Sequence, residues 1–312
     1  MAGSRERVLI TGARGFIGAA MAINRVEAGD EVHLLLRPEG DRWRLRSIEG
    51  RYHRHEADLR DAADVRRAVA AARPDVVIHA AAHGTTHGRH GRIEILTSNV
   101  LGAANLLDAL AAHDYRALVN VGSSSEYGHK NGPMAEADRL EPRSDYGVAK
   151  AAASLLFQAE AWKGKPVCTV RIFSAYGPGE DPERLASHVM GCCRRGESPR
   201  VTSGSQPRDW IYIDDVVALL CRAADCAEVR GRILHAGTGR IQTVRDMVEG
   251  ILIEAGGRLH AAYGAEIHRP DEPTVWVADT RETRAITGWE PRFTLQTGIA
   301  RMWQSFASTR AA

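Results

Sequence analysis

Apolar and polar positions follow two different periods along the first 173 residues of the chain. Short apolar runs predict buried strands at 7–10, 31–36, 75–80, 117–121 and 167–173, with a weaker strand at 52–57. Stretches with helical spacing lie between them, at 16–28, 61–72, 92–112 and 145–162. Apolar strands that are each followed by a helix predict right-handed crossovers and a parallel sheet covered on both faces.

A glycine-rich turn separates the first strand from the first helix. Gly12 permits the tight turn, Gly15 lets the backbone approach a pyrophosphate, and Gly18 lets the helix pack closely on the strand. Phe16 and Ile17 are the first residues of the helix. Its free N–H groups and the positive end of its dipole would then bind phosphates. The strand and the helix lie where this mechanism needs them, so we interpret the turn as a dinucleotide-binding site.

The second strand ends on Arg37, where an NAD enzyme would place an acidic residue for the ribose 2′-hydroxyl. Arg14 lies inside the glycine turn, and two guanidiniums there favour a 2′-phosphate. We therefore expect NADP, with NAD as the open alternative. The remaining expected cofactor contacts follow the third and fourth strands or lie on the next helix: Asp58, Leu59, Ala80, Ala81, Ala82 and Asn99.

After Phe173 the regular alternation of predicted strands and helices is lost, and Gly, Pro and short mixed elements dominate. We expect an α/β fold with a Rossmann-type doubly wound parallel sheet and a smaller C-terminal substrate-binding domain. The cofactor domain would comprise 1–173 and about 207–236, because the chain returns to the sheet there. The substrate domain would comprise 174–206 and 237–312.

Composition narrows the class of protein. Lys and Arg number 41 against 39 Asp and Glu, so no basic excess points to nucleic acid. Five cysteines without a CxxC pair predict reduced thiols and no metal site. The chain enters a strand at once, and no apolar run approaches the length of a membrane span. We expect a cytoplasmic protein that has no membrane partner.

Tyr146 and Lys150 are four residues apart at the start of a predicted helix, so their side chains share one face. The ammonium beside the phenol, together with the positive nicotinamide ring of the cofactor, is expected to lower the tyrosine pKa, which lets the phenol exchange a proton with a sugar hydroxyl or ketone. The serine cluster 123–125 ends a central strand in the crevice where such sheets bind ligands. One serine would polarise the oxygen that Tyr146 protonates.

These motifs together resemble the extended short-chain dehydrogenase/reductases, which modify nucleotide-activated sugars. The resemblance covers nearly the whole chain, from TGARGFIG at 11–18 through HAAA at 79–82 and YGVAK at 146–150 to QPRDWIYIDD at 206–215 and TGWEP at 287–291. Because the family's catalytic Ser or Thr stands four residues before a Tyr-Gly pair, it implies Ser123 as the catalytic serine, with Ser124 as second choice.

The resemblance also implies an NAD(P)-dependent enzyme and a nucleotide-diphosphate sugar as substrate. Arg208 and Arg269 resemble the family's two diphosphate-binding arginines. Members dimerise through two helices, so we expect a homodimer whose four-helix bundle is formed by 92–112 and 145–162.

Several positions depart from the pattern of particular activities. Ser125 stands where 4,6-dehydratases carry a catalytic acid, and Glu126 comes one residue late, although a bulge would restore it. Ser125 also replaces the cysteine of epimerase–reductases such as GDP-fucose synthase, whose histidine corresponds to His188. Ser174, in an FSAYGP segment, resembles deoxysugar reductases and epimerases. Ser124, Ser125, Ser174 and His188 are therefore candidate substrate contacts.

The leading interpretation is an NADPH-dependent reductase of a nucleotide-linked 4-keto-deoxysugar. A C4 epimerase or a 4,6-dehydratase with tightly bound NAD(P) is the alternative. A non-catalytic NADP-binding sensor or scaffold on the same fold is the alternative of another class, because fold alone does not decide function.

Overall fold

The computed structural model describes residues 5–84, 90–266 and 275–308. Its centre is a seven-stranded sheet in the order β11-β6-β5-β4-β1-β2-β3, and every paired neighbour is parallel. The strands are β1 (Arg7–Thr11), β2 (Glu31–Leu36), β3 (His53–Glu56), β4 (Val76–His79), β5 (Ala117–Ser123), β6 (Val167–Ile172) and β11 (Ile233–Ala236). The α/β Rossmann-type fold expected from the sequence is confirmed.

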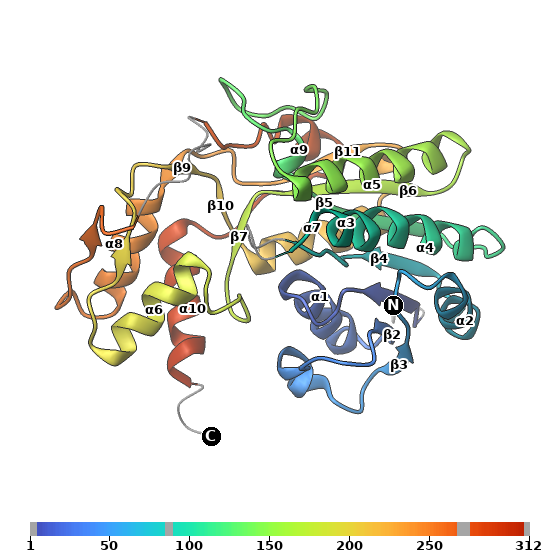
Figure 1. The fold of residues 1–312 in the computed structure, drawn as a ribbon, viewed down its shortest axis with the longest axis horizontal. Helices are drawn as coiled ribbons and strands as arrows, with labels where there is room; N and C mark the ends of the chain where they lie inside the picture. Colours follow the sequence, from blue (N-terminus) through green and yellow to red (C-terminus); the bar gives the residue numbers. More distant parts are fainter. Residues whose placement is uncertain (1–4, 85–89, 267–274, 309–312) are drawn as a thin grey trace.

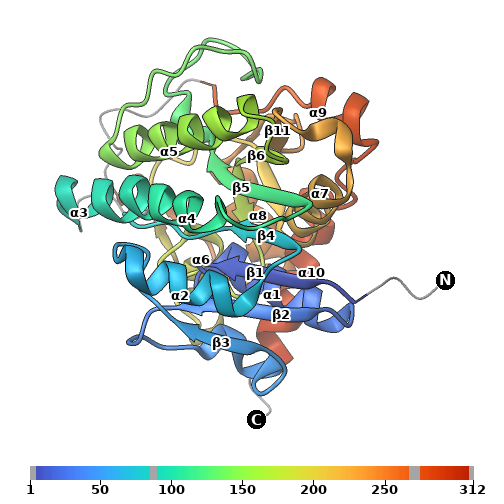
Figure 2. The ribbon, with the colours of Figure 1, turned by 90° about the vertical axis from the view of Figure 1, so that its right-hand side faces the viewer.

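Two apolar clusters cover the two faces of the sheet, as the unbroken apolar strands require. One face packs on α2 (Ala62–Ala72), α4 (Gly102–Leu110) and α5 (Asp145–Trp162). The other packs on α1 (Phe16–Glu27) and α7 (Ile213–Asp225). Figure 2 shows α4 and α5 side by side on the outside of the molecule. Three short 3₁₀ helices complete this part: η1 (Trp43–Ile48), η3 (Ser124–Glu126) and η4 (Ala227–Val229).

The other elements gather beyond the carboxyl ends of the strands, on the left of Figure 1. They are β7 (Ser174–Tyr176), α6 (Leu185–Arg195), β8 (Arg200–Val201), β9 (Pro207–Arg208), β10 (Trp210–Tyr212), β12 (Gln242–Thr243), α8 (Val244–Glu254), β13 (Ala262–Tyr263) and α10 (Leu295–Ser308). One late helix, α9 (Arg281–Thr287), instead contacts β11 and η4 beside the sheet. The assignment of a cofactor domain and a substrate domain stays a prediction.

Local sequence explains where several helices begin and end. The Asp61 carboxylate accepts hydrogen bonds from the backbone of Ala63 and Asp64 and caps α2, which ends at Arg73 in the left-handed conformation. Ser144 caps α5 by accepting from Gly147 N at 3.0 Å. These caps are the reason that both helices begin within one residue of the predicted positions.

The helix expected at 92–112 is composite. It consists of α3 (Arg92–Leu96), a π-helical turn η2 (Thr97–Leu101) and α4, and it ends at Leu110. By length and composition alone, the run Arg92–Leu110 is apolar enough to cross a membrane, which the sequence analysis did not expect. Half of that run is buried inside the fold, and core helices of soluble proteins pass the same test. It is therefore weak evidence for a membrane span.

Candidate active site

The sheet changes direction between β1 and β4, because β2 and β3 follow on one side and β5, β6 and β11 on the other. Ligands of open α/β sheets bind at such a switch point, beyond the carboxyl ends of the strands. A Cβ atom added to Gly12 would lie 2.5 Å from the Ala81 backbone, and one added to Gly18 would lie 2.3 Å from Gly12 O. The glycines are thus required for close packing of the turn.

The same turn fits a dinucleotide. A Cβ on Gly15 would approach only Gly12 O, at 3.2 Å, so one side of the turn stays open. Gly15 is the N-cap of α1, and no side chain of the described residues caps the helix there. The N–H groups of the first turn are therefore available to a pyrophosphate, as the sequence predicts.

Two arginines make the rim of this turn electropositive. Burial and the neighbouring charges of Arg37 and Arg42 lower the pKa of Arg14, whose guanidinium donates to the Glu39 carbonyl. Arg37 is exposed at the end of β2. The structure therefore brings Arg14 and Arg37 close enough to repel each other, where the sequence analysis placed the ribose.

Other predicted cofactor contacts are held by the fold in different ways. The Asp58 carboxylate binds Arg60, whose Nη2 lies 2.6 Å away, and this hydrogen bond holds the pKa of Asp58 below its usual range. The Leu59 carbonyl accepts a hydrogen bond from Asn105. The buried Asn99 amide bridges the His83 backbone, donating to its carbonyl at 2.8 Å and accepting from its N–H at 2.9 Å. Asn99 therefore fixes the segment that follows Ala80, Ala81 and Ala82.

The predicted catalytic side chains do come together. Ser123 is the last residue of β5 and forms a hydrogen bond with Tyr146, on the first turn of α5. Lys150 lies one turn further along α5, is 2% exposed, and donates from Nζ to the Val121 carbonyl at 2.7 Å. Strand β5 and helix α5 thus supply all three groups.

Burial is the main influence on the pKa of Tyr146 in the protein alone. Burial raises the pKa of Tyr146, and this effect outweighs the lowering by the Ser123 hydrogen bond and the Arg184 charge. Burial also lowers the pKa of Lys150, against the charge of Glu126. In the protein alone the phenol is therefore neutral, and the lowering expected from Lys150 together with a nicotinamide ring stays a prediction.

The three serines have different surroundings. Ser124 is buried, and its Oγ accepts a hydrogen bond from the indole N–H of Trp276 at 3.1 Å. Ser123 Oγ accepts from Ser125 N at 3.2 Å and contacts Tyr146. Ser123 is thus the serine that meets Tyr146, and its assignment as the catalytic serine stays a prediction.

Glu126 points away from the reacting groups. Its Oε2 accepts from Arg171 Nε at 2.8 Å, and its Oε1 accepts from Ser123 N and Ser154 Oγ at 2.8 and 3.0 Å. The side chain has no exposed surface. Helix η3, rather than a bulge, turns this carboxylate back into the sheet, where it supports Ser123 through the backbone.

The substrate-side candidates are dispersed. Arg208 lies on β9 and donates to the Pro207 carbonyl, while Ser174 lies on β7 with its N–H bonded to the Asp209 carbonyl. His188 is exposed on α6, with Nε2 3.8 Å from Cys192 Sγ. Arg269 lies outside the described residues. The structure therefore tests none of these four as a group around a sugar.

Three residues that the sequence analysis missed also shape this region. Arg184 is close enough for its charge to lower the pKa of Tyr146, and Trp276 contacts Ser124. Arg44 donates to the carbonyls of Arg14 and Gly179 at 3.0 and 2.6 Å, which links the glycine turn to the loop before α6. Single arginines and tryptophans outside a motif gave no signal, since their roles depend on contacts distant in sequence.

The site and the fold define a dinucleotide-dependent enzyme of the extended short-chain dehydrogenase/reductase type. The model of the NAD dependent epimerase/dehydratase family matches residues 8–237, so the chain belongs to that family. Its members are NAD-dependent enzymes that act on nucleotide sugars.

Similar proteins agree with this family. The chain is 28% identical to a dTDP-glucose 4,6-dehydratase of Streptomyces griseus, over 94% of this chain and 92% of that protein. It is 27% identical to a probable UDP-glucuronate 4-epimerase of Rhizobium meliloti, with 95% of each covered. Among solved structures, MoeE5 in complex with UDP-glucuronic acid and NAD has a TM-score of 0.83 and 31% identity, covering 97% of this chain and 99% of that one.

Proposed function

We propose that this protein is a nucleotide-sugar 4-epimerase that uses NAD(P) bound at the Gly12–Gly18 turn and a UDP-linked sugar as substrate. The observation that carries the proposal is the pairing of Tyr146 with Ser123 while Glu126 is held in a buried ion pair with Arg171. Inversion at C4 needs an acid–base group at one hydroxyl only. Elimination of water across C5 and C6 needs further acid–base groups.

The chain's own residues would act on the C4 oxygen of the sugar. Tyr146 would accept the proton of the C4 hydroxyl and later return it, with Ser123 bonded to the same oxygen. The bound dinucleotide would supply the hydride acceptor and donor at C4. Lys150 would bind the nicotinamide ribose. Because the hydride is returned to the opposite face of the same carbon, the reaction consumes no cofactor.

The serine at position 125 supports an epimerase over a dehydratase. A serine hydroxyl is a poor acid and a poor base near neutral pH, so Ser125 cannot replace the acid that dehydratases carry there. The UDP-sugar part of the proposal is supported by similarity to the probable UDP-glucuronate 4-epimerase and to MoeE5 with its bound UDP-glucuronic acid.

A second candidate is the NADPH-dependent reduction of a 4-keto-deoxysugar, which needs the same Tyr146, Ser123 and Lys150. The pair of arginines at the ribose position, Arg14 and Arg37, favours it, since a 2′-phosphate would neutralise their repulsion. The two candidates differ in cofactor stoichiometry. A reductase consumes one NADPH per product, and an epimerase consumes none.

The deciding experiment incubates the protein with NAD⁺ or NADP⁺ and, separately, UDP-glucuronic acid, UDP-glucose and dTDP-glucose, with products followed by NMR. We expect a C4 epimer from a UDP-sugar, no net change in cofactor absorbance, and no product with Tyr146→Phe. A 4-keto-6-deoxy product would show a dehydratase. In a second incubation with NADPH and a nucleotide 4-keto sugar, stoichiometric NADPH oxidation without epimerisation in the first would show the reductase.

A further inference from the structure

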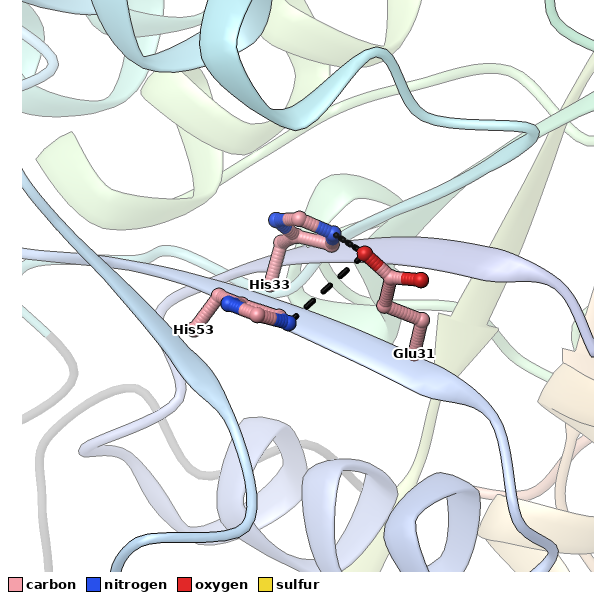
Figure 3. Close-up of side chains that lie close together, drawn as sticks. All are labelled: Glu31, His33 and His53. Carbon is pink, nitrogen blue, oxygen red and sulfur yellow. Dashed lines mark hydrogen bonds and ion pairs between the residues drawn. The ribbon is translucent and has the colours of Figure 1, made fainter.

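A histidine-rich cluster lies at the edge of the sheet, outside the candidate active site. Glu31 and His33 alternate along β2, and His53 and His55 alternate along β3. The two strands are parallel, with His33 opposite His53 and Leu35 opposite His55. Because alternate residues of a strand point to the same face, all four side chains share one face of the sheet. Figure 3 shows Glu31, His33 and His53 turned toward one another.

The atoms of this cluster have the separations that a small metal ion needs. Glu31 Oε1 lies 3.3 Å from His33 Nε2 and 3.6 Å from His53 Nε2, and one ligand atom from each of the three residues falls within 4.8 Å of the others. Tetrahedral zinc with bonds of about 2.0–2.1 Å places neighbouring ligand atoms roughly 3.3–3.4 Å apart. The Glu31–His33 pair, at 3.3 Å, therefore matches this separation already, and the Glu31–His53 pair, at 3.6 Å, is slightly longer.

The third pair requires a small adjustment. The rings of His33 and His53 are nearly parallel, with centroids 4.7 Å apart and 21° between their planes. Ring-nitrogen lone pairs lie in the ring plane, so one ring must tilt before both nitrogens face one ion. The His53 side chain is 58% exposed and has room to tilt, whereas His33 is buried and fixed.

His55 is placed to orient the buried ligand. Its Nε2 lies 2.9 Å from Nδ1 of His33, so His33 can donate from Nδ1 and keep Nε2 free to bind a metal. Metal-binding histidines usually have such a partner on the other ring nitrogen.

We propose that Glu31, His33 and His53 bind one zinc ion, with His55 as a positioning residue and water at the fourth coordination position. Two imidazoles and a carboxylate are a known zinc ligand set, and imidazole disfavours Mg²⁺ and Ca²⁺. Glu31 and His53 are the first residues of their strands, so the ion would lie at the amino ends of β2 and β3. The catalytic groups lie at the opposite, carboxyl end of the sheet.

This position gives the ion a structural role. Strand β3 is the last strand of the sheet and pairs only with β2 among the described strands. An ion held by both strands would fasten that edge. The inference does not depend on the reaction catalysed, and its test needs no substrate.

The test uses the full chain without a histidine tag, freed of metal with EDTA and then dialysed. Isothermal titration with Zn²⁺ should give one site per chain, titration with Mg²⁺ should give none, and Zn²⁺ should raise the melting temperature. Co²⁺ should give the visible absorption of a four-coordinate nitrogen–oxygen site. Absence of zinc binding, or equal binding of Mg²⁺, would overturn the proposal.

Variants locate the site. His53→Ala removes an exposed ligand and should weaken Zn²⁺ binding more than tenfold without unfolding the chain, whereas His260→Ala, another exposed histidine, should bind as the wild type does. His55→Ala should weaken binding roughly 10- to 100-fold, with His55→Gln restoring part of it. Wild-type affinity in His53→Ala, or an equal loss in His260→Ala, would contradict the assignment.

Discussion

The surroundings of Tyr146 determine its protonation state, which the YxxxK motif alone does not reveal. Burial keeps the phenol neutral by raising its pKa, while Ser123 and Arg184 oppose that shift. A buried phenol responds strongly to any positive charge brought near it, because the local dielectric is low. The positive nicotinamide of an oxidised cofactor would supply such a charge. Proton transfer would then depend on cofactor binding.

The first prediction concerns Tyr146→Phe, which removes only the hydroxyl. We expect the rate of the chemical step to fall roughly 10²–10⁴-fold, with stability and cofactor affinity unchanged. Ser123→Ala should also lose rate, and Ser124→Ala should be milder because Ser124 is bonded to Trp276. Single-turnover kinetics with Tyr115→Phe as a control would measure this. Near-normal turnover in Tyr146→Phe would refute the assignment.

The second prediction concerns cofactor choice at Arg37. If the 2′-phosphate of NADP lies between Arg14 and Arg37, Arg37→Asp should weaken NADP⁺ binding much more than NAD⁺ binding, since a charged partner is removed. Arg230→Asp, on an exposed loop, is the matched control. Fluorescence titration of the wild type and both variants with NAD⁺ and with NADP⁺ would measure these affinities. Equal losses for NAD⁺ and NADP⁺ would show that Arg37 does not bind a phosphate.

At the scale of elements, β5, η3 and β6 meet behind Ser123 and hold it in place. Arg171 on β6 and Glu126 on η3 form an ion pair whose side chains are 2% and 0% exposed. The ring of Tyr127 lies 4.4 Å from the guanidinium carbon of Arg171, and the Tyr127 hydroxyl lies 2.6 Å from His235 Nε2 on β11. One polar network therefore joins three neighbouring strands directly behind Ser123.

The third prediction follows from that network. Arg171→Met leaves the Glu126 carboxylate buried without its partner and should lower the free energy of unfolding by about 3–5 kcal/mol. The exposed pair of Arg195 and Glu197 provides the comparison, and Arg195→Met should cost less than about 1 kcal/mol. Urea denaturation followed by circular dichroism gives both values. Similar losses in the two variants would mean that the buried pair contributes little.

The fourth prediction concerns assembly through α3, α4 and α5. Helices α3 and α5 and the turn η2 between α3 and α4 carry exposed apolar side chains: Ile93, Leu101, Val148, Leu155 and Trp162. We predict that two copies pack these faces into a four-helix bundle, so Leu155→Glu should yield a monomer by light scattering at micromolar concentration. Ile253→Glu, at an even more exposed apolar residue of α8, should leave the dimer intact. A monomeric wild type would contradict the bundle.

Across the whole molecule, buried ionisable groups make stability depend on pH. Glu180 is 8% exposed in the loop before α6, and burial raises its pKa to about 7 despite the nearby Arg184 and its bonds to Ser187. The unfolded chain would release this proton near the ordinary carboxyl value of about 4.3. Between those two values the folded state binds more protons than the unfolded state, so stability falls as pH rises.

The fifth prediction uses Glu180→Gln, which stays neutral at every pH. The variant should be about as stable as the wild type near pH 4.5. It should become more stable by roughly 1.4 kcal/mol per pH unit up to about pH 7, about 3 kcal/mol in all. Urea denaturation of both proteins from pH 4.5 to 8 would test this. A constant difference between them would show that Glu180 is charged in the folded protein.

The sequence predicts the parallel sheet and the meeting of Ser123 with Tyr146 well, because apolar runs and the YxxxK spacing are local signals. It does not reveal α6, α7, α8 or α10, although each of these helices has an apolar face, because the Gly and Pro residues around them obscure where they begin and end. The return to the sheet expected over 209–235 is made by β11 alone, since β10 pairs with β7 outside the main sheet. Pairing between distant segments has no local pattern.

The candidate site also combines residues that local sequence patterns predict with residues that they do not. Ser123 and Tyr146 are found from spacing, because strand ends and helix turns fix their directions. The buried position of the Glu126 side chain could not be predicted, because the one-turn 3₁₀ helix η3 turns it back into the sheet. The histidine cluster at the edge also stayed hidden, because its members come from two strands that pair only after folding.

The contact between Gly12 and Ala81 has a consequence for how such a protein can diversify. Any side chain at position 12 would push the first loop away from the fourth strand, whichever sugar is bound. Substitution of Gly12 is therefore blocked, because it would part the glycine turn from the segment that follows β4. Over evolutionary time, new specificities would therefore arise through substitutions outside this contact, while Gly12 and Ala81 are retained.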